Sequence, residues 1–229
     1  MLKNITVVVA LMSLVLGGCV VAPQQPVQMN QEVFSSKTTR VGVAMTPLPK
    51  VDTQFPGAAC LLCLAAASVA NSSLTAYTKT LPYEDIPKLK NDIAELVKKK
   101  GSEVRIIEED INVDDLPSYT KEGATIARKD YSAIGKKYNL DKLIVVDVRT
   151  LGIYRTYSAY IPTSEPYAVL SGAGYIVNLS DNNYDWYLPV NINKNSDRPW
   201  DEAPNFPGLS NAYFQALEMG RDSFLKPFN

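Results

Sequence analysis

An unbroken apolar run, Leu143 to Val146, opens the stretch LIVVDVRTLGIY. A run of this kind is typical of a strand that is buried on both faces, as in a sheet covered by helices. Upstream of it, strand-like and helix-like patterns alternate along the chain, and such alternation favours parallel strands joined by helical crossovers. The sequence therefore predicts an α/β fold built around a central strand.

The elements before this strand follow from periodicity and from breaking residues. We expect strands at 40–45 and 103–110 and helices at 60–77, 86–100 and 120–139. The second helix is the clearest, because its apolar residues fall on one face, with Asp85 before it and Gly101 after it. The third has a stripe made of Ala127, Tyr131, Ile134 and Tyr138.

The pattern changes after the central strand. Strand-like runs at 151–161, 167–179 and 184–192 follow one another, and residues 180–183 form a plausible turn between the last two. A loop at 191–207 leads to a C-terminal helix, with the following residues on its buried side: Leu209, Tyr213, Ala216, Leu217, Gly220 and Phe224. We therefore predict a single layered α/β domain over 38–229, with a mixed sheet, helices packed on it and a C-terminal helix.

The N-terminus carries a targeting signal. Lys3 precedes an uncharged, mostly apolar run from Asn4 to Gly18, which has the length of a signal-peptide core and is too short for a spanning anchor. The tetrapeptide Leu-Gly-Gly-Cys, ending at Cys19, resembles a bacterial lipobox. That resemblance implies removal of residues 1–18 as a signal peptide and attachment of acyl chains, such as palmitate, to Cys19; a plain signal peptide with a chance cysteine is the alternative.

A lipid-modified cysteine attaches a protein to a membrane without a spanning helix. Val20 stands where inner-membrane lipoproteins carry Asp, so the resemblance implies a protein of the outer membrane that faces the periplasm. Residues 19–37 are rich in Pro, Gln and Ser and show little periodicity. We expect them to be a flexible tether between the lipid and the domain.

Charge and composition exclude several function classes. The chain contains 23 basic and 24 acidic residues, and this near-neutral balance argues against a nucleic-acid partner. It has no histidine, which removes histidine-based acid–base chemistry and the usual zinc sites. No G-x-S-x-G motif or glycine-rich phosphate loop is present, and the acidic clusters at 108–110 and 114–115 lack EF-hand spacing. We expect no cofactor, no metal and no enzymatic activity.

Cys60 and Cys63 form the sharpest local motif, a C-x-x-C at the start of a helix. A helix N-terminus lowers the pKa of the first thiol, which is how redox sites of this spacing function. A redox motif should follow a strand directly, and the oxidising periplasm favours a structural disulfide. We interpret the pair as a disulfide or as buried thiols, with thiol redox or metal handling as the alternative.

The segment AACLLCLAAASVA, residues 58–70, is apolar throughout apart from Ser68. It is too short to span a bilayer as one helix. Small residues suit close packing of a helix against a sheet or a neighbouring subunit. We interpret it as a core helix, with membrane contact as the alternative.

Aromatic residues crowd the later strands. They include Tyr154, Tyr157, Tyr160, Trp186 and Tyr187. These rings could form a partner surface for a protein or a glycan. Alternatively, they reflect ordinary strand propensity, with rings closing a face of the sheet, and we favour this second interpretation.

With its lipobox and this order of elements, the chain resembles a group of small bacterial outer-membrane lipoproteins. The group includes the curli secretion channel, the Pel polysaccharide export lipoprotein and neisserial lipoproteins, with a fold like the N-terminal domain of TolB. The points of contact are the RVGVA strand at 40–44, the LIVVDVR strand at 143–149 and the hairpin at 172–187 before a terminal helix. The resemblance implies a non-enzymatic accessory of envelope assembly or secretion that works as an oligomer, and it carries over no functional residue.

The leading hypothesis is thus a lipid-anchored outer-membrane lipoprotein that binds protein partners and self-associates. Two alternatives stay open: a thiol-active or metal-handling protein that uses Cys60 and Cys63, and a monomeric binder of cell-wall glycan that uses the aromatic strands.

Overall fold

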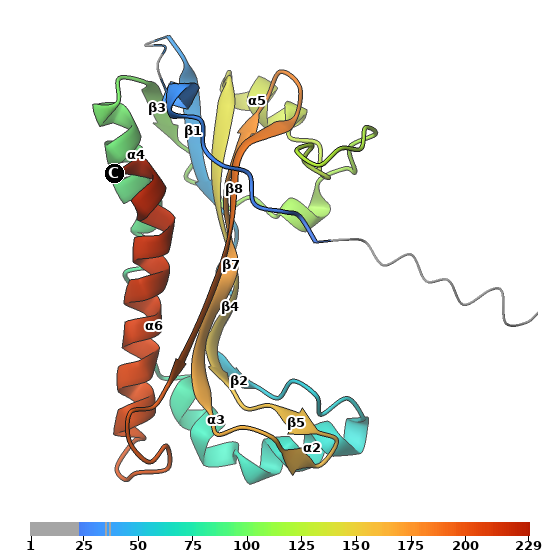
Figure 1. Ribbon diagram of the computed structural model, residues 1–229, viewed down its shortest axis with the longest axis vertical. Helices are drawn as coiled ribbons and strands as arrows, with labels where there is room; N and C mark the ends of the chain where they lie inside the picture. Colours follow the sequence, from blue (N-terminus) through green and yellow to red (C-terminus); the bar gives the residue numbers. More distant parts are fainter. Residues whose placement is uncertain (1–22, 35, 37) are drawn as a thin grey trace, which may run out of the picture.

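A six-stranded mixed sheet forms the centre of the molecule (Figure 1). The structure, a computed structural model, describes residues 23–34, 36 and 38–229. The strands are β1 (Arg40–Met45), β2 (Asp52–Gln54), β3 (Glu103–Ile106), β4 (Lys142–Tyr154), β7 (Tyr167–Asn178) and β8 (Asn183–Asn195). Their order is β3-β1-β4-β7-β8, and β2 pairs with the far end of β4. The first four strands are parallel to one another, whereas β7 and β8 are antiparallel, which confirms the expected mixed sheet.

The apolar run that opens β4 is buried, as expected for a central strand. Leu143 to Val146 have at most 1% of their surface exposed, with β1 on one side and β7 on the other. β1 has the bounds that the sequence predicts. The hairpin between β7 and β8 also turns at the predicted place, where Asn182 takes a positive φ of 60°.

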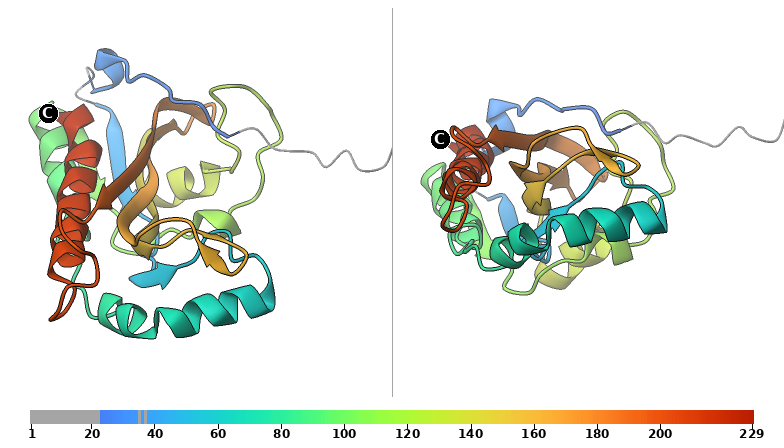
Figure 2. Two further views of the ribbon diagram at one scale, coloured as in Figure 1. Left: turned by 60° about the horizontal axis from the view of Figure 1, so that its bottom comes forward. Right: turned by 90° about the horizontal axis from the view of Figure 1, so that it is seen from below.

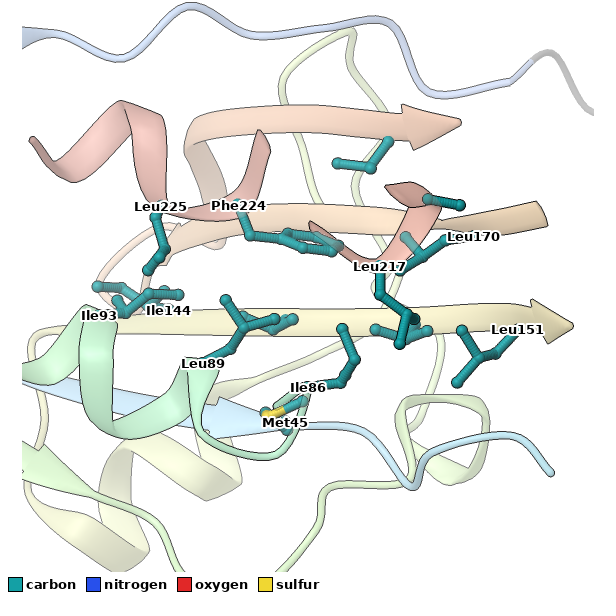
Figure 3. Packing of buried hydrophobic residues seen from close by; sticks show 14 of the residues in the cluster. Met45, Ile86, Leu89, Ile93, Ile144, Leu151, Leu170, Leu217, Phe224 and Leu225 are labelled. Atoms are coloured by element: carbon teal, nitrogen blue, oxygen red, sulfur yellow. The ribbon is translucent and has the colours of Figure 1, made fainter. Parts of the chain in front are cut away.

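Two helices cover one face of the sheet (Figure 1). α6 (Pro207–Leu225) runs along the long strands, and α4 (Leu89–Lys99) packs beside it. Figure 3 shows the core between them, with Ile93 and Leu89 from α4 facing Phe224 and Leu217 from α6 over β4. All six residues predicted for the inner side of the C-terminal helix are buried. α4 begins at Leu89, three residues later than expected, and Asp85 before it accepts a hydrogen bond from Lys88.

The opposite face is covered in a different way from the prediction. The helix expected at 120–139 is wrong over most of its length, because only α5 (Ser132–Tyr138) is helical. The backbone before it is held by other partners: the Asn182 amide donates to the carbonyls of Ala127 and Lys129, and Asp130 accepts from the Ser132 amide. The expected stripe still packs in one core, which it shares with the 3₁₀ helix η2 (Val113–Asp115).

The helix expected at 60–77 is two helices. α2 (Leu61–Ala70) and α3 (Ser72–Thr78) meet at Asn71 with an angle of 76° between them. The strand expected at 151–161 is also interrupted, because β4 ends at Tyr154 and a small hairpin of β5 (Tyr157–Ser158) and β6 (Ile161–Pro162) follows. Figure 2 shows α2, α3 and this hairpin gathered at one end of the molecule.

The two ends of the chain meet near the other end of the sheet. Val27 pairs with Tyr187 of β8, and the 3₁₀ helix η1 (Gln31–Phe34) places Phe34 against Phe228 of the 3₁₀ helix η3 (Lys226–Phe228). Part of the segment expected as a flexible tether, 19–37, is therefore packed on the domain. The signal peptide and Cys19 lie outside the described residues.

Candidate functional site: an apolar end of the molecule

The most unusual surface lies on α2 and on the tip of the β5–β6 hairpin. Exposed fractions are 84% for Leu61, 70% for Leu62 and 75% for Val69. The other large exposed apolar side chains here are Leu64, Tyr160 and Ile161. The hydroxyl oxygen of Tyr160 lies 3.7 Å from Sγ of Cys60, so the hairpin tip adjoins the start of α2. We call these six residues the apolar end; contiguous exposed apolar surface of this kind marks an interaction site.

The apolar end carries no charge. Residues 53–78 and 156–164 contain no Asp, Glu, Lys or Arg. Arg155, at the base of the hairpin, is engaged elsewhere: it donates to Asn71 Oδ1 over 2.7 Å, and its guanidinium lies 4.9 Å from the ring centre of Trp200. The surface therefore offers hydrophobic contact and no ion pairs.

α2 touches the rest of the molecule along a narrow stripe. Only Cys63 and Ala67 of this helix are buried, and they pack with Ala58 and Tyr157 in a small separate core. The expectation of a core helix at 58–70 is therefore wrong, because α2 extends past the sheet instead of lying on it (Figure 2). α3 is better anchored: Leu74 and Thr78 are buried, and the hydroxyl of Thr53 in β2 donates to that of Thr78.

Asn71 fixes the corner between the two helices. It is buried, and its side-chain amide donates to Ala67 O and to the Tyr157 hydroxyl, each over 2.7 Å. Its carbonyl oxygen accepts from Arg155. One side chain thus joins α2, α3 and the hairpin.

We expect Asn71→Ala to lower the stability of the corner by about 1–3 kcal/mol, because it leaves buried partners without hydrogen bonds. The loss should be local, and hydrogen exchange of the α2 amides should rise more than exchange in β4. Ser72→Ala is the matched control, since Ser72 is exposed and adjacent. Equal exchange rates for α2 in both variants would contradict this role for Asn71.

Cys60 and Cys63 form a disulfide in the structure, with their Cα atoms 4.9 Å apart. Cys60 occupies the N-cap of α2, where its sulfur accepts the Cys63 backbone N–H. Cys60 is exposed and Cys63 is buried. The preceding strand, β2, ends six residues before Cys60, so the motif does not follow a strand directly.

The aromatic residues considered as a partner surface do not come together. Trp186 is buried in the core under α6, Tyr157 is buried under α2, and Tyr187 lies on the opposite face of the sheet with Tyr175. Tyr154 packs against Tyr167, and only Tyr160 is well exposed. These positions fit the interpretation of ring packing within the sheet better than a glycan platform.

The polar cluster around Asp147 is paired internally. Asp147 accepts from Thr46 Oγ1 over 3.0 Å and from Arg149 Nε over 2.7 Å, and Arg149 also donates to Asp114. The hydrogen bond from Arg149 lowers the pKa of the Asp114 carboxyl. Burial raises the pKa of the Tyr131 and Tyr175 hydroxyls well above their ordinary value, so both stay protonated. Within the described residues, no three His, Cys, Asp or Glu side chains gather as a metal site would require.

Membrane-spanning criteria also single out the apolar end. In the part of the chain that the structure describes, no single helix is both long and apolar enough to cross a bilayer. The bent pair of α2 and α3 meets the criteria when its two helices are taken together, by length and composition alone. The signal for this site in the sequence is the apolar segment at 58–70, for which the core helix was the favoured interpretation and membrane contact the alternative.

No family model and no curated protein matches the chain. Several solved structures share a loosely similar fold. PelC from Paraburkholderia phytofirmans, a dodecamer, matches over 90% of this chain and 98% of its own, at 9% identity and a TM-score of 0.35. Protein XCC0632 from Xanthomonas campestris (DUF330) matches over 90% of this chain and 95% of its own, at 12% identity and a TM-score of 0.34.

Lipoprotein GNA1162 from Neisseria meningitidis matches over 79% of this chain and 96% of its own, at 10% identity and a TM-score of 0.28. PelC and a neisserial lipoprotein are the kinds of protein that the sequence resemblance named. Similarities of this size carry no conclusion about function.

Proposed function

We propose that this chain is a non-enzymatic lipoprotein of the outer membrane that faces the periplasm. Acyl chains on Cys19 hold it at the membrane, and the domain acts as an accessory of envelope assembly or secretion that self-associates. The lipobox-like Leu16 to Cys19 and the absence of histidine support this proposal from the sequence. The Asp147 carboxylate, which is paired with Thr46 and Arg149, supports a binding role over a catalytic one.

The observation that carries a binding role is the apolar end. Leu61, Leu62 and Val69 are each at least 70% exposed on a helix without a charged residue. Apolar surface in water is unfavourable by about 25 cal/mol per Å², so a contact that covers these side chains is favoured. A surface of this kind acts by contact and needs no reactive group.

The test compares the full-length protein with a Cys19→Ala variant, both produced in a bacterium with a lipoprotein-processing pathway. We expect the unsubstituted protein to fractionate with outer membranes and to begin at an acylated Cys19 by mass spectrometry. The variant should lose both properties. An unmodified Cys19 in the mature protein would refute the anchor.

Self-association is tested separately by the native mass of the acylated protein in mild detergent, corrected for the micelle. We expect a discrete assembly of several copies. A clean monomer would remove self-association from the proposal and leave the anchor untouched.

A thiol-exchange function is the second candidate, favoured by one observation. The exposed Cys60 caps α2 and is bonded to the buried Cys63, an arrangement in which the helix N-terminus stabilises a Cys60 thiolate after reduction. The Cys60→Ser, Cys63→Ser double variant tests it. If the folded double variant performed its role in the envelope as well as the unsubstituted protein does, this candidate would be eliminated.

A further inference from the structure

The apolar end has the chemistry of a lipid-contacting surface. Nearly the whole circumference of α2 is exposed, since only Cys63 and Ala67 are buried. The exposed residues are Leu, Ala and Val together with Ser68, whose hydroxyl donates to the Leu64 carbonyl within the same helix. A hydroxyl satisfied in this way is compatible with a hydrocarbon environment.

The same surface lacks the usual features of a protein interface. The centres of such interfaces are enriched in aromatic residues, Met and Arg, and they have a polar rim. α2 contains none of those residue types, and no charged residue flanks it between Thr53 and Thr78. The one aromatic residue of the apolar end, Tyr160, presents a hydroxyl beside the apolar side chains, as tyrosines do at membrane–water boundaries.

The N-terminal segment meets the domain before Val27. The Gln24 side chain donates to the Ala124 carbonyl over 2.8 Å, and Val27 pairs with Tyr187 of β8. Five residues separate Cys19 from Gln24, an extended length of up to about 18 Å, so a lipid on Cys19 stays close to the domain.

This segment runs toward the same side of the molecule as α2. Residues 23–26 point to the side on which the N-terminal end of α2 extends, in both Figure 1 and Figure 2. An acyl anchor and the apolar end can therefore face the same bilayer.

We propose that the apolar end inserts into the leaflet that holds the acyl chains, so that the protein contacts the membrane at two points. This inference rests on the lipid anchor proposed above. α2, with ten residues and a length of about 15 Å, lies at the boundary between headgroups and acyl chains and does not cross the bilayer. The small core of Ala58, Cys63, Ala67 and Tyr157 holds the helix to the domain while its other faces contact lipid.

The experiment places a tryptophan on the apolar end and a matched one elsewhere. Leu62→Trp and Met219→Trp are made in the full-length acylated protein, because both positions are exposed and Met219 lies on α6. Each variant is reconstituted into vesicles of phosphatidylethanolamine and phosphatidylglycerol, with or without brominated acyl chains. The emission of Trp186 and Trp200, measured in the unsubstituted protein, is subtracted. We expect quenching at position 62 to be at least about threefold greater than at position 219.

Flotation of the vesicles separates the two proposals. If the protein floats but quenching is equal at both positions, this inference is overturned and the anchor stands. A Trp at position 62 whose emission is blue-shifted but not quenched also overturns the inference, and it assigns the surface to contact with a second copy. If a Leu62→Trp protein that also carries Cys19→Ala still floats and is quenched, the membrane contact of the apolar end stands without the anchor, which is then judged by the mass spectrometry of Cys19 alone. Protein that does not float in either form overturns both.

Discussion

Replacing Phe224 by alanine is expected to lower the free energy of unfolding by about 3–5 kcal/mol. Phe224 has no exposed surface and lies on α6 at the centre of the core shared with α4 and β4 (Figure 3). Alanine removes the ring and leaves a cavity that a rigid sheet and a 19-residue helix cannot close. Urea denaturation followed by far-UV circular dichroism measures the change.

Phe214→Ala is the matched control, because Phe214 lies on the same helix and is 46% exposed. We expect it to change stability by no more than about 1 kcal/mol. If both variants lowered the free energy of unfolding equally, the effect would come from α6 as a whole and not from the packing of Phe224.

The second large effect is expected for Gly172→Ala in β7. A Cβ atom at this position would lie 2.0 Å from the backbone oxygen of Asp147 in β4. The register between these strands shifts nearby, between Val148 and Thr150, so the two backbones approach closely at a β-bulge. Moving Asp147 would also disturb its hydrogen bonds with Thr46 and Arg149.

We expect Gly172→Ala to lower the free energy of unfolding by about 3 kcal/mol, near the upper end of the range for overpacked sites. Thermal and urea denaturation both report the loss. Ser171→Ala, one residue earlier on the same strand, should be nearly neutral. A stable Gly172→Ala protein would mean that the bulge can open without cost, and the close approach would then have no part in the strand register.

Local periodicity was sufficient for much of the fold. β1, the apolar run of β4, the turn at Asn182 and the buried side of α6 were all predictable, because the relevant pattern lies within a few neighbouring residues. The mixed sheet followed from the order of these elements.

The failures have a common physical cause, which is tertiary contact overriding local preference. Residues 120–131 show helical spacing, but the Asn182 side chain and strand-like bridges hold their backbone in another shape. The apolar composition of α2 fits a core helix and a lipid-facing helix equally well. Only its position beyond the end of the sheet distinguishes the two, and the sequence of α2 carries no information about that position.

The packing of residues 27–34 has a mechanical consequence for an anchored protein. Val27 is held to β8 by two backbone hydrogen bonds, of 2.9 and 3.0 Å to Tyr187, whereas Val33 and Phe34 are buried in the core. A pull on the N-terminus loads the hydrogen bond from Gln24 to the Ala124 carbonyl and then the Val27 bridge, before the buried Val33 and Phe34. Release would lengthen the linker by the six residues up to Val33, about 20 Å of extended chain. In the lipid-anchored protein proposed above, this longer linker would let the domain move further from the bilayer while its core stays folded.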